Sequence, residues 1–346
     1  MTTREMPRLE FSSRNRCSTL RTHRAVLGFT LIELAIAIAI IGLLLGALLV
    51  PLATHSNAGK NRATERDLKE IKEALIGFGI STGRLPCPDT TGNGLENLTG
   101  ALAPPPATPP DCVALEGNLP WLTLGVVAVD AWDQRFRYRV NQQFAYPVYT
   151  GQPPDANYMD LTDIGDTVVV TRGAAKSLLV ETQAAAAVVY SVGIDGLGGT
   201  NLDGNTLALP EGRDQRSNTD GVYASGTTTG ADGSADVTDS GADFVTAGVQ
   251  VGHIVFNLTD GSQSLVTAVA ATTLTVGGTV DGTDNDFDTG DRYAVSPFVN
   301  RPYTRPTPGC NDNPAFGGPL CGFDDLMITL PTAVLIGRLI EANLLP

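Results

Sequence analysis

The chain has 346 residues, of which 42% are hydrophobic, so it can bury a sizeable core and has room for about two domains. Its 38 glycines and 22 prolines, with only 6% aromatic residues, favour turn-rich β structure over a helical globule. A formal net charge of -14 argues against a protein that binds nucleic acid through a broad basic face.

Basic residues are concentrated at the start of the chain. Residues 1–28 hold six of the 23 basic residues and two of the 37 acidic residues. The remainder of the chain therefore has 17 basic and 35 acidic residues, or a charge of -18. A basic flank before an apolar segment and an acidic body after it follow the positive-inside rule. We therefore expect a cytoplasmic N-terminus and an exported, periplasmic body.

An apolar segment follows the basic residues. No charged residue occurs from Leu34 to Val50, and with its flanks this segment approaches the roughly 20 residues that a bilayer requires. We expect a transmembrane helix over 29–50. A secretory signal would have a shorter apolar core and a better cleavage site than Ala53 offers. An ordinary anchor leaves Glu33 unexplained, because an ionisable group inside a membrane segment is costly.

The residues from Gly28 to Leu34 read GFTLIEL. This stretch resembles the signature of type IV pilins and type II secretion pseudopilins and matches it at every position. In that family a prepilin peptidase cuts after the glycine and methylates the new N-terminus. The resemblance implies a leader peptide over 1–28, processing between Gly28 and Phe29, and assembly with other pilin or pseudopilin subunits.

The resemblance also gives Glu33 a role. In such filaments the glutamate of one subunit neutralises the N-terminal ammonium of a neighbour, a pair that is favourable only when both charges are desolvated together. Glu33 is then an assembly residue, paired with the freed amine of Phe29 in the next subunit. The alternative is a glutamate close enough to the membrane interface to be solvated.

A second helical pattern follows Pro51, which we expect to interrupt the helix because proline lacks an N–H group. One apolar stripe has steps of three, four and three residues: Leu68, Ile71, Leu75 and Phe78. Such a stripe packs on the sheet of its own globular head. With a stop at Gly83, residues 29–82 form one long, interrupted helix of roughly 80 Å at 1.5 Å per residue.

Four cysteines lie in the exported body and a fifth, Cys17, in the basic leader. An even set in an exported acidic domain indicates two disulfides. Three pairings are possible, and we favour the sequence-local ones, Cys87 with Cys112 and Cys310 with Cys321, because they close short loops rich in glycine and proline. Buried free thiols are the alternative.

Segments rich in β-branched and aromatic residues predict strands after the first cysteine loop: VVAVDAWDQRFRYRV, AYPVYT and AAVVYSVGIDG. The run from Asp130 to Val140 resembles the D-x-W-G-x-x-(Y/F)-x-Y run that forms the first strands of pseudopilins. It departs from that run at Asp133 and Gln134, where Gly-Asn is common.

The glycine-rich segment 191–205 carries several oxygen-bearing side chains, which hard cations such as calcium prefer. It resembles the S-x-G-x-D-G-x-x-G-T run of major pseudopilins, in which calcium stabilises a C-terminal loop, and Asp324 and Asp325 resemble the D-D-(I/L) that follows it. The resemblance implies a possible calcium site, with no other cofactor expected: Asp195, Asn201, Asp203 and Asp324. Plain turns capped by Asx side chains are the alternative.

Residues 217–296 differ in composition from both flanks. They are almost devoid of Lys and Arg and rich in Thr, Gly, Asp and Val. Alternating apolar residues between turn signals predict a small all-β module, inserted between two parts of a pilin-like head, 83–216 and 297–346. His253 and the aspartates of DGTDNDFDTGD could bind a metal ion, but we favour the alternative, that the aspartates form an acidic loop exposed to solvent.

An amphipathic pattern ends the chain. It predicts a helix from Thr332 to Asn343, whose apolar residues pack on the head: Val334, Leu335, Leu339 and Ile340. The helix is too short to span a membrane. The predicted fold is therefore α+β and pilin-like, with a long N-terminal helix on an antiparallel sheet and an inserted all-β domain.

No catalytic grouping is found: the sequence has no nucleophile elbow, no phosphate-binding loop and no zinc-protease motif. We expect a structural subunit, not an enzyme. We favour a minor, low-copy subunit over the major one, since an insertion of this size is awkward in every copy of a tightly packed filament. The alternative is a pilin-anchored adhesin or substrate-recognition head, displayed by the inserted module.

Overall fold

The computed structural model describes residues 30–102, 109–148, 158–163, 165, 167–172, 178–219, 224–279, 282–295, 298–305, 307–310, 312 and 318–345. Side chains of 44–56 and 178–184 are outside this description. The chain divides after His55 into two units, Met1–His55 and Ser56–Pro346. The fold is mixed α+β, as predicted, with two sheets and five helices among the described residues.

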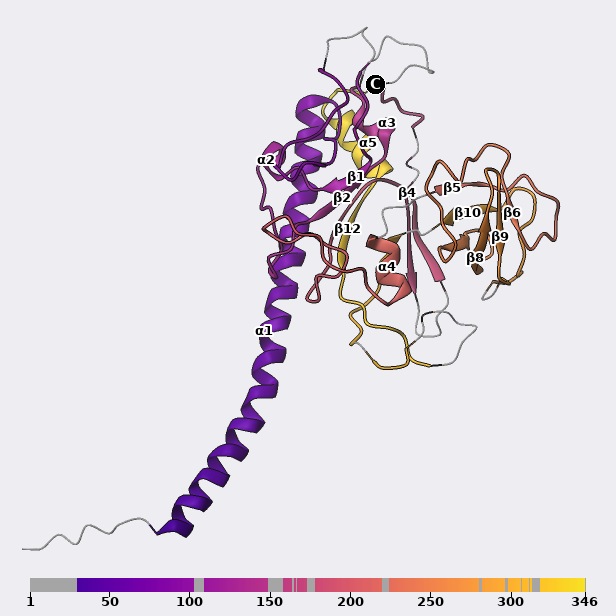
Figure 1. Ribbon diagram of the computed structural model, residues 1–346. Helices are drawn as coiled ribbons and strands as arrows, with labels where there is room; N and C mark the ends of the chain where they lie inside the picture. The colour runs from indigo at the N-terminus through magenta and orange to yellow at the C-terminus, as the bar shows by residue number, and fades with distance from the viewer. Residues whose placement is uncertain are drawn as a thin grey trace, which may run out of the picture. The chain divides into compact units, whose positions relative to one another are not determined.

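Helix α1 extends from Leu31 to Thr82 (Figure 1). The interruption predicted at Pro51 is wrong, because the helical assignment continues through it. A proline removes one N–H from the helical ladder, and the turns on both sides retain their own hydrogen bonds. The helix ends where the sequence indicates, with Gly83 in the left-handed region at a φ of 75°.

Among the residues that the structure describes, no helix combines the length and the apolar character needed to cross a membrane. Residue 29 and the side chains of residues 44–50 lie outside this description, so the transmembrane helix predicted over 29–50 is described only in part.

One face of α1 after Ser56 enters the core of the head. Leu68, Ile71 and Leu75 are 2%, 0% and 1% exposed, as the stripe predicts. Ile76 completes this face at 5% exposed, whereas Phe78 is half-buried and lies under the guanidinium of Arg84. Strands β2 and β4 and the last helix supply the facing side chains of this core: Phe136, Tyr138, Val140, Ala187, Val189, Leu335 and Leu339.

The first sheet belongs to the head and has the order β1-β2-β4-β3-β11, with β12 also paired to β4. Its strands have these bounds: β1 Glu116–Asn118, β2 Arg137–Val140, β3 Thr167–Arg172, β4 Leu178–Ser191, β11 Phe298–Val299 and β12 Leu326–Pro331. All pairs are antiparallel except β11 with β3. Short helices lie between them: α2 Trp121–Leu124, α3 Gln142–Ala145 and α4 Arg213–Thr219.

The strand predictions are only partly right. AAVVYS belongs to β4, but in the segment Val126–Val140 only the last four residues form a strand. AYPVYT gives no strand among its described residues, where Val148 forms an isolated bridge with Met159. In both segments turns compete with the extended conformation, and β propensity depends on the pairing that tertiary structure supplies.

Helix α5, Thr332–Glu341, is two residues shorter than predicted. Leu335 and Leu339 are fully buried in the head, whereas Val334 and Ile340 are 40% and 42% exposed. The predicted packing therefore holds for two of the four apolar residues. Residues four apart lie on the same face of a helix, so Leu335 and Leu339 share the face that points to the core.

The second sheet is formed entirely by residues 224–295 and has the order β5-β10-β7-β8-β9-β6 (Figure 1). Its strands are all antiparallel, with these bounds: β5 Ala224–Thr227, β6 Val237–Thr238, β7 Ile254–Asn257, β8 Gln263–Val269, β9 Thr273–Val276 and β10 Arg292–Val295. It has its own apolar core, which includes Phe244, Phe287 and Tyr293.

The two sheets share a further apolar cluster. Val168 and Val170 of β3 and Val299 of β11 pack with Phe256 of β7 and Ala294 of β10, and all five are at most 1% exposed. Helix α4, which spans the composition boundary expected at residue 217, also contacts β11. The module is thus joined to the head by buried apolar side chains as well as by its two chain connections.

Candidate functional site

The first turn of α1 is closed by two side chains. The Thr30 N–H and hydroxyl both donate to Glu33 Oε2, at 3.1 and 3.0 Å, and the Glu33 N–H donates to Thr30 Oγ1 at 3.3 Å. This is a capping box, in which the residue before the helix and the third helical residue satisfy each other's free backbone donors. Glu33 is thus held at the start of the helix.

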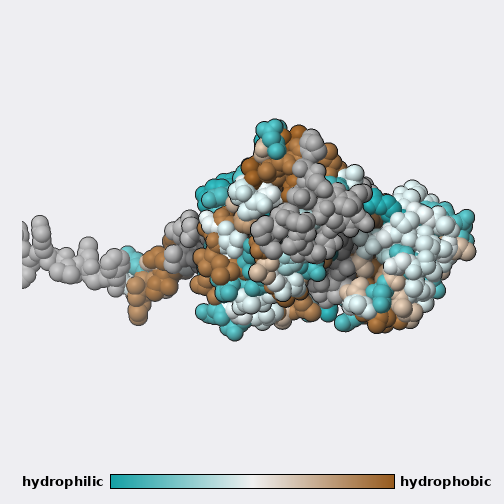
Figure 2. All heavy atoms as spheres, turned by 90° about the horizontal axis from the view of Figure 1, so that it is seen from above, coloured by the Kyte–Doolittle hydropathy of each residue, from teal (hydrophilic) through white to brown (hydrophobic). Residues whose placement is uncertain are grey.

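The described side chains that follow are apolar and open to solvent. Every residue from Thr30 to Leu43 is exposed, with Leu31 at 89% and Leu43 at 74%. In Figure 2 these side chains form a hydrophobic, brown stretch. Glu33 is the one charged residue among them. A long apolar surface of this kind requires a partner, because exposed patches mark sites of association.

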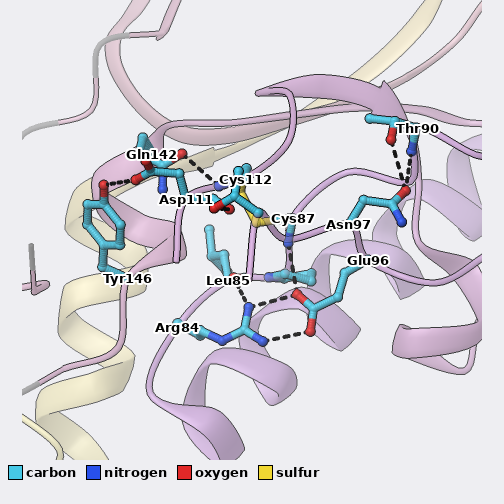
Figure 3. The surroundings of a disulfide bond; sticks show 12 residues. Arg84, Leu85, Cys87, Thr90, Glu96, Asn97, Asp111, Cys112, Gln142 and Tyr146 are labelled. Carbon is cyan, nitrogen blue, oxygen red and sulfur yellow. Dashed lines mark hydrogen bonds and ion pairs between the residues drawn. A yellow bond between two sulfur atoms is a disulfide. The ribbon is translucent and has the colours of Figure 1, made fainter. Parts of the chain in front are cut away.

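The first cysteine loop of the head is closed by a disulfide between Cys87 and Cys112, whose sulfur atoms are buried (Figure 3). Beside it the guanidinium of Arg84 forms two bonds with Glu96, at 2.8 and 2.6 Å, and the Cys87 N–H donates to Glu96 Oε2 at 3.1 Å. This fork ties the end of α1 to the loop, since bidentate Arg–carboxylate pairs fix orientation.

A second disulfide joins Cys310 and Cys321, which are 11 residues apart. Its neighbourhood is polar: the Cys321 N–H donates to Asp312 Oδ1 at 2.8 Å, and the Cys321 carbonyl accepts from Arg301 at 2.8 Å. Both disulfides thus hold segments that contain no strand or helix among their described residues.

The departure from the pseudopilin run lies in the turn from Asp130 to Gln134. Asp133 has a φ of 64°, a left-handed conformation that suits the glycine common at this position. Asp130 organises the turn, because its Oδ1 accepts from the Trp132 and Gln134 N–H groups at 2.8 and 3.0 Å. Burial raises the pKa of Asp130, although its other oxygen accepts from the Ser191 hydroxyl.

The predicted calcium ligands fall in two places. Asp195 and Asp324 meet, and the Gln215 amide donates to Asp195 Oδ1 at 3.0 Å and to Asp324 Oδ1 at 2.8 Å. Burial raises the pKa of Asp324 to about 6. The Gln215 amide nitrogen therefore lies between the two carboxylates and donates to both, in the position that a bound cation would occupy.

Asn201 and Asp203 lie elsewhere. Asn201 forms an isolated bridge with Gln134, and Asp203 lines a polar cavity together with Asp89 and Arg135. Among the described residues, Asp195, Asp203 and Asp324 do not come together as a group of three that could hold a metal ion. The calcium site at the four predicted ligands stays a prediction.

The acidic loop of the module gathers three carboxylates. Oxygen atoms of Asp284, Asp286 and Asp288 lie within 4.8 Å of one another. Burial, then these neighbours, raise the pKa of Asp286. His253 does not join them: it lines a separate cavity beside α4, and its Nδ1 accepts from the Gln250 N–H at 3.1 Å.

A buried ionic network, which the sequence reasoning missed, lies where the module meets the head. Arg172 of β3 forms two bonds of 2.8 Å with Asp214 of α4, and Arg301 contacts Asp214 at 3.0 Å and Asp312 at 3.4 Å. Arg172 also donates to Gln263 of β8 at 3.3 Å. These charged side chains are at most 1% exposed, so each carboxylate must be matched by a cation.

Comparison with known protein families decides what the start of the chain is. Residues 23–49 match the family described as "Prokaryotic N-terminal methylation motif". These residues are a prepilin-type signal. Type IV pilins and pseudopilins carry this signal, so the resemblance of residues 28–34 to their signature is confirmed. No curated protein and no solved structure matches the chain.

The prepilin-type signal implies processing by prepilin peptidase and assembly with other pilin subunits, and it indicates a structural subunit. The signal includes Glu33, which the structure places in the capping box with Thr30. Gly28 and Phe29, the predicted processing residues, lie outside the described residues. The spacing T-x-x-E from Thr30 to Glu33 was readable in the sequence and would have predicted the capping box.

Proposed function

We propose that this chain is a minor, low-copy subunit of a type II secretion pseudopilus or a type IV pilus. In this proposal prepilin peptidase cuts between Gly28 and Phe29, which removes residues 1–28, and methylates the new N-terminal amine of Phe29. The observation that carries the proposal is a prepilin-type signal over 23–49 that continues into an exposed apolar helix with a single charge, Glu33.

The helix would serve two purposes in turn. Before assembly, residues 29–50 hold the subunit in the inner membrane, with the basic N-terminus in the cytoplasm and the acidic body in the periplasm. In the filament the same apolar side chains pack against neighbouring helices. Glu33 then pairs with the N-terminal ammonium of an adjacent subunit, where both charges are removed from water together.

A low copy number is supported by the module at 224–295. It adds a six-stranded sheet with its own core to the head. A head enlarged in this way occupies more lateral space than a pilin head without an insertion. Neighbouring positions along a tightly packed filament would have to leave room for it, which is easiest where few copies are present.

The module also supports a second candidate, a recognition head displayed by a pilin-type anchor. The supporting observation is that the sheet of the module contributes no strand to the sheet of the head. Removing residues 224–295 tests the two candidates. Loss of surface or substrate binding, with filament assembly retained, would support recognition, whereas loss of secretion or assembly would support a structural role.

The proposed subunit is tested by following its incorporation into filaments. Glu33→Ala is compared with Glu73→Ala, which removes an exposed acid from the same helix. We expect Glu33→Ala to remain in the membrane at wild-type abundance and to be lost from the sheared filament fraction, while Glu73→Ala enters filaments normally. Equal incorporation of wild type and Glu33→Ala would reject the proposed assembly role.

A further inference from the structure

A cavity of about 340 Å³ lies between α4 of the head and the segment that leads into β7 of the module. Helix α4 contributes Arg213, Arg216 and Ser217, and the other wall is formed by residues 250–254. Its volume is at the lower end of the roughly 300–1,000 Å³ that is typical of small-molecule sites. The cavity is separate from the helix that carries the prepilin-type signal.

The two arginines of this cavity form no direct salt bridge with a carboxylate among the described residues. Within the described part of the chain, neither guanidinium makes a hydrogen bond or an ion pair. The nearby carboxylates are already engaged, because Asp214 pairs with Arg172 and Arg301, and Arg301 also contacts Asp312.

Arg213 is in the less favourable position of the two. It is half-buried, and burial lowers its pKa; Asp312 and Asp214 act in the opposite direction, whereas Arg172 lowers the pKa further. A guanidinium stays protonated in proteins. Asp312 and Asp214 thus offset the cost of burying this charge only in part, and an anion in the cavity would offset more of it, because a charge that is partly removed from water without a direct partner is unfavourable.

The setting makes this pair of cations unusual. The whole chain has a net charge of -14, and Arg292 is the only Lys or Arg in 217–296. One acid, Glu211, lies on the rim of the cavity; it is exposed and makes no ion pair with either arginine. Glu211 weakens the local positive potential without neutralising it.

We propose that this cavity binds a small molecule through an oxyanion group, a phosphate, sulfate or carboxylate, held by the guanidinium groups of Arg213 and Arg216. The planar fork of a guanidinium matches these groups with two parallel hydrogen bonds. The ligand lies where the module joins the head, so its binding also links α4 to the segment before β7.

The proposal is tested by isothermal titration calorimetry of the full chain in a non-ionic detergent. Inorganic phosphate, sulfate and acetate are titrated at equal ionic strength, with chloride as the reference. We expect at least one of the three oxyanions to bind more tightly than chloride. Preference for phosphate or sulfate over acetate assigns the group to a phosphoryl or sulfuryl ligand, and the reverse preference assigns it to a carboxylate.

Four variants are expected to change oxyanion binding in different directions. Arg213→Gln and Arg216→Gln should each weaken binding about tenfold or more, the loss expected for a charged hydrogen bond. Glu211→Gln should strengthen binding, and Arg305→Gln, which removes an exposed arginine outside the cavity, should leave it unchanged. Arg216 is exposed and unpaired, so its variant is expected to fold even if Arg213→Gln does not. No preference over chloride, or wild-type binding by Arg216→Gln, would overturn the proposal.

Discussion

Glu33 and Thr30 satisfy each other at the start of α1. Both hydrogen bonds from Thr30 reach the same carboxylate oxygen, Oε2, and no hydrogen bond to Oε1 is made within the described residues. A carboxylate can accept about four hydrogen bonds. An ammonium group from a neighbouring subunit can therefore bind Glu33 without breaking the capping box.

Glu33→Gln separates the cap from the charge. A glutamine at this position can also accept from the Thr30 N–H, so the first turn should be kept, but the charge is lost. We expect incorporation into filaments to fall as far as in Glu33→Ala. The measurement is the ratio of filament to membrane protein. Incorporation at the wild-type ratio would mean that the cap, and not the charge, is what assembly needs.

Thr30→Ala makes the converse change. It removes the cap hydroxyl and leaves the Glu33 charge, at a cost of about 0.5–2 kcal/mol in helix stability. We expect filament incorporation to persist, with more fraying of the first turn seen as faster amide hydrogen exchange there. Thr30→Ser, which keeps the hydroxyl, serves as the control and should exchange like wild type.

Asp133 has a backbone conformation that favours glycine, with a φ of 64°. Asp133→Gly should raise the free energy of unfolding by about 1 kcal/mol, because the left-handed region costs an L-residue about 1–2 kcal/mol and the greater freedom of glycine in the unfolded chain offsets part of this gain. Asp133→Val should lower it by about 1–3 kcal/mol, since β-branched residues tolerate this region poorly. Chemical denaturation measures both changes, and a stabilised valine variant would contradict the account of this turn.

Asp130 should make stability depend on pH. Its pKa is raised by burial, so the folded protein binds this proton more tightly than the unfolded chain, whose carboxyl has a pKa of about 3.9. The contribution of this group to stability is thus present at low pH and is lost as the pH rises through the folded-state pKa.

Asp130→Asn is the matched variant for this effect. Its amide oxygen can accept from the Trp132 and Gln134 N–H groups, and its amide nitrogen can donate to Ser191. We expect the difference in unfolding free energy between variant and wild type to grow in favour of the variant as the pH rises above about 4. A constant difference across this range would show that Asp130 does not titrate differently in the two states.

The disulfide between Cys87 and Cys112 should be a major source of stability for the irregular loop that it closes. Replacing both residues by serine removes a crosslink that spans 25 residues, and the expected loss is about 3 kcal/mol. The double serine variant at Cys310 and Cys321, which span 11 residues, should lose slightly less. Thermal unfolding under oxidising conditions measures both losses, and equal stability of wild type and the first variant would contradict the prediction.

Periodic patterns made the strongest parts of the fold predictable. The stripe Leu68, Ile71 and Leu75 could be identified because an α-helix repeats every 3.6 residues, and Gly83 ends α1 because it can adopt a left-handed conformation. The strands of the second sheet lie within the segment 217–296, which was conspicuous because its composition differs from that of its flanks. Glu33 was identifiable because a single acid in an apolar run is conspicuous.

Other features depend on contacts that no local pattern records. Strands as short as β1 and β11, of three and two residues, are too brief for an alternating pattern. The partners Arg172, Asp214 and Arg301 come from three distant segments, and the fold alone brings them together. For the same reason the sequence could not show that Asp195 and Asp324 meet while Asp203 lies elsewhere.

The central claim is that the chain is a processed prepilin-type subunit, and intact-protein mass spectrometry of the membrane-extracted chain tests it most directly. The account predicts a mass that corresponds to Phe29–Pro346 with one added methyl group, and a gain of four hydrogens on reduction of the two disulfides. A mass that retains residues 1–28 and carries no methyl group would contradict it.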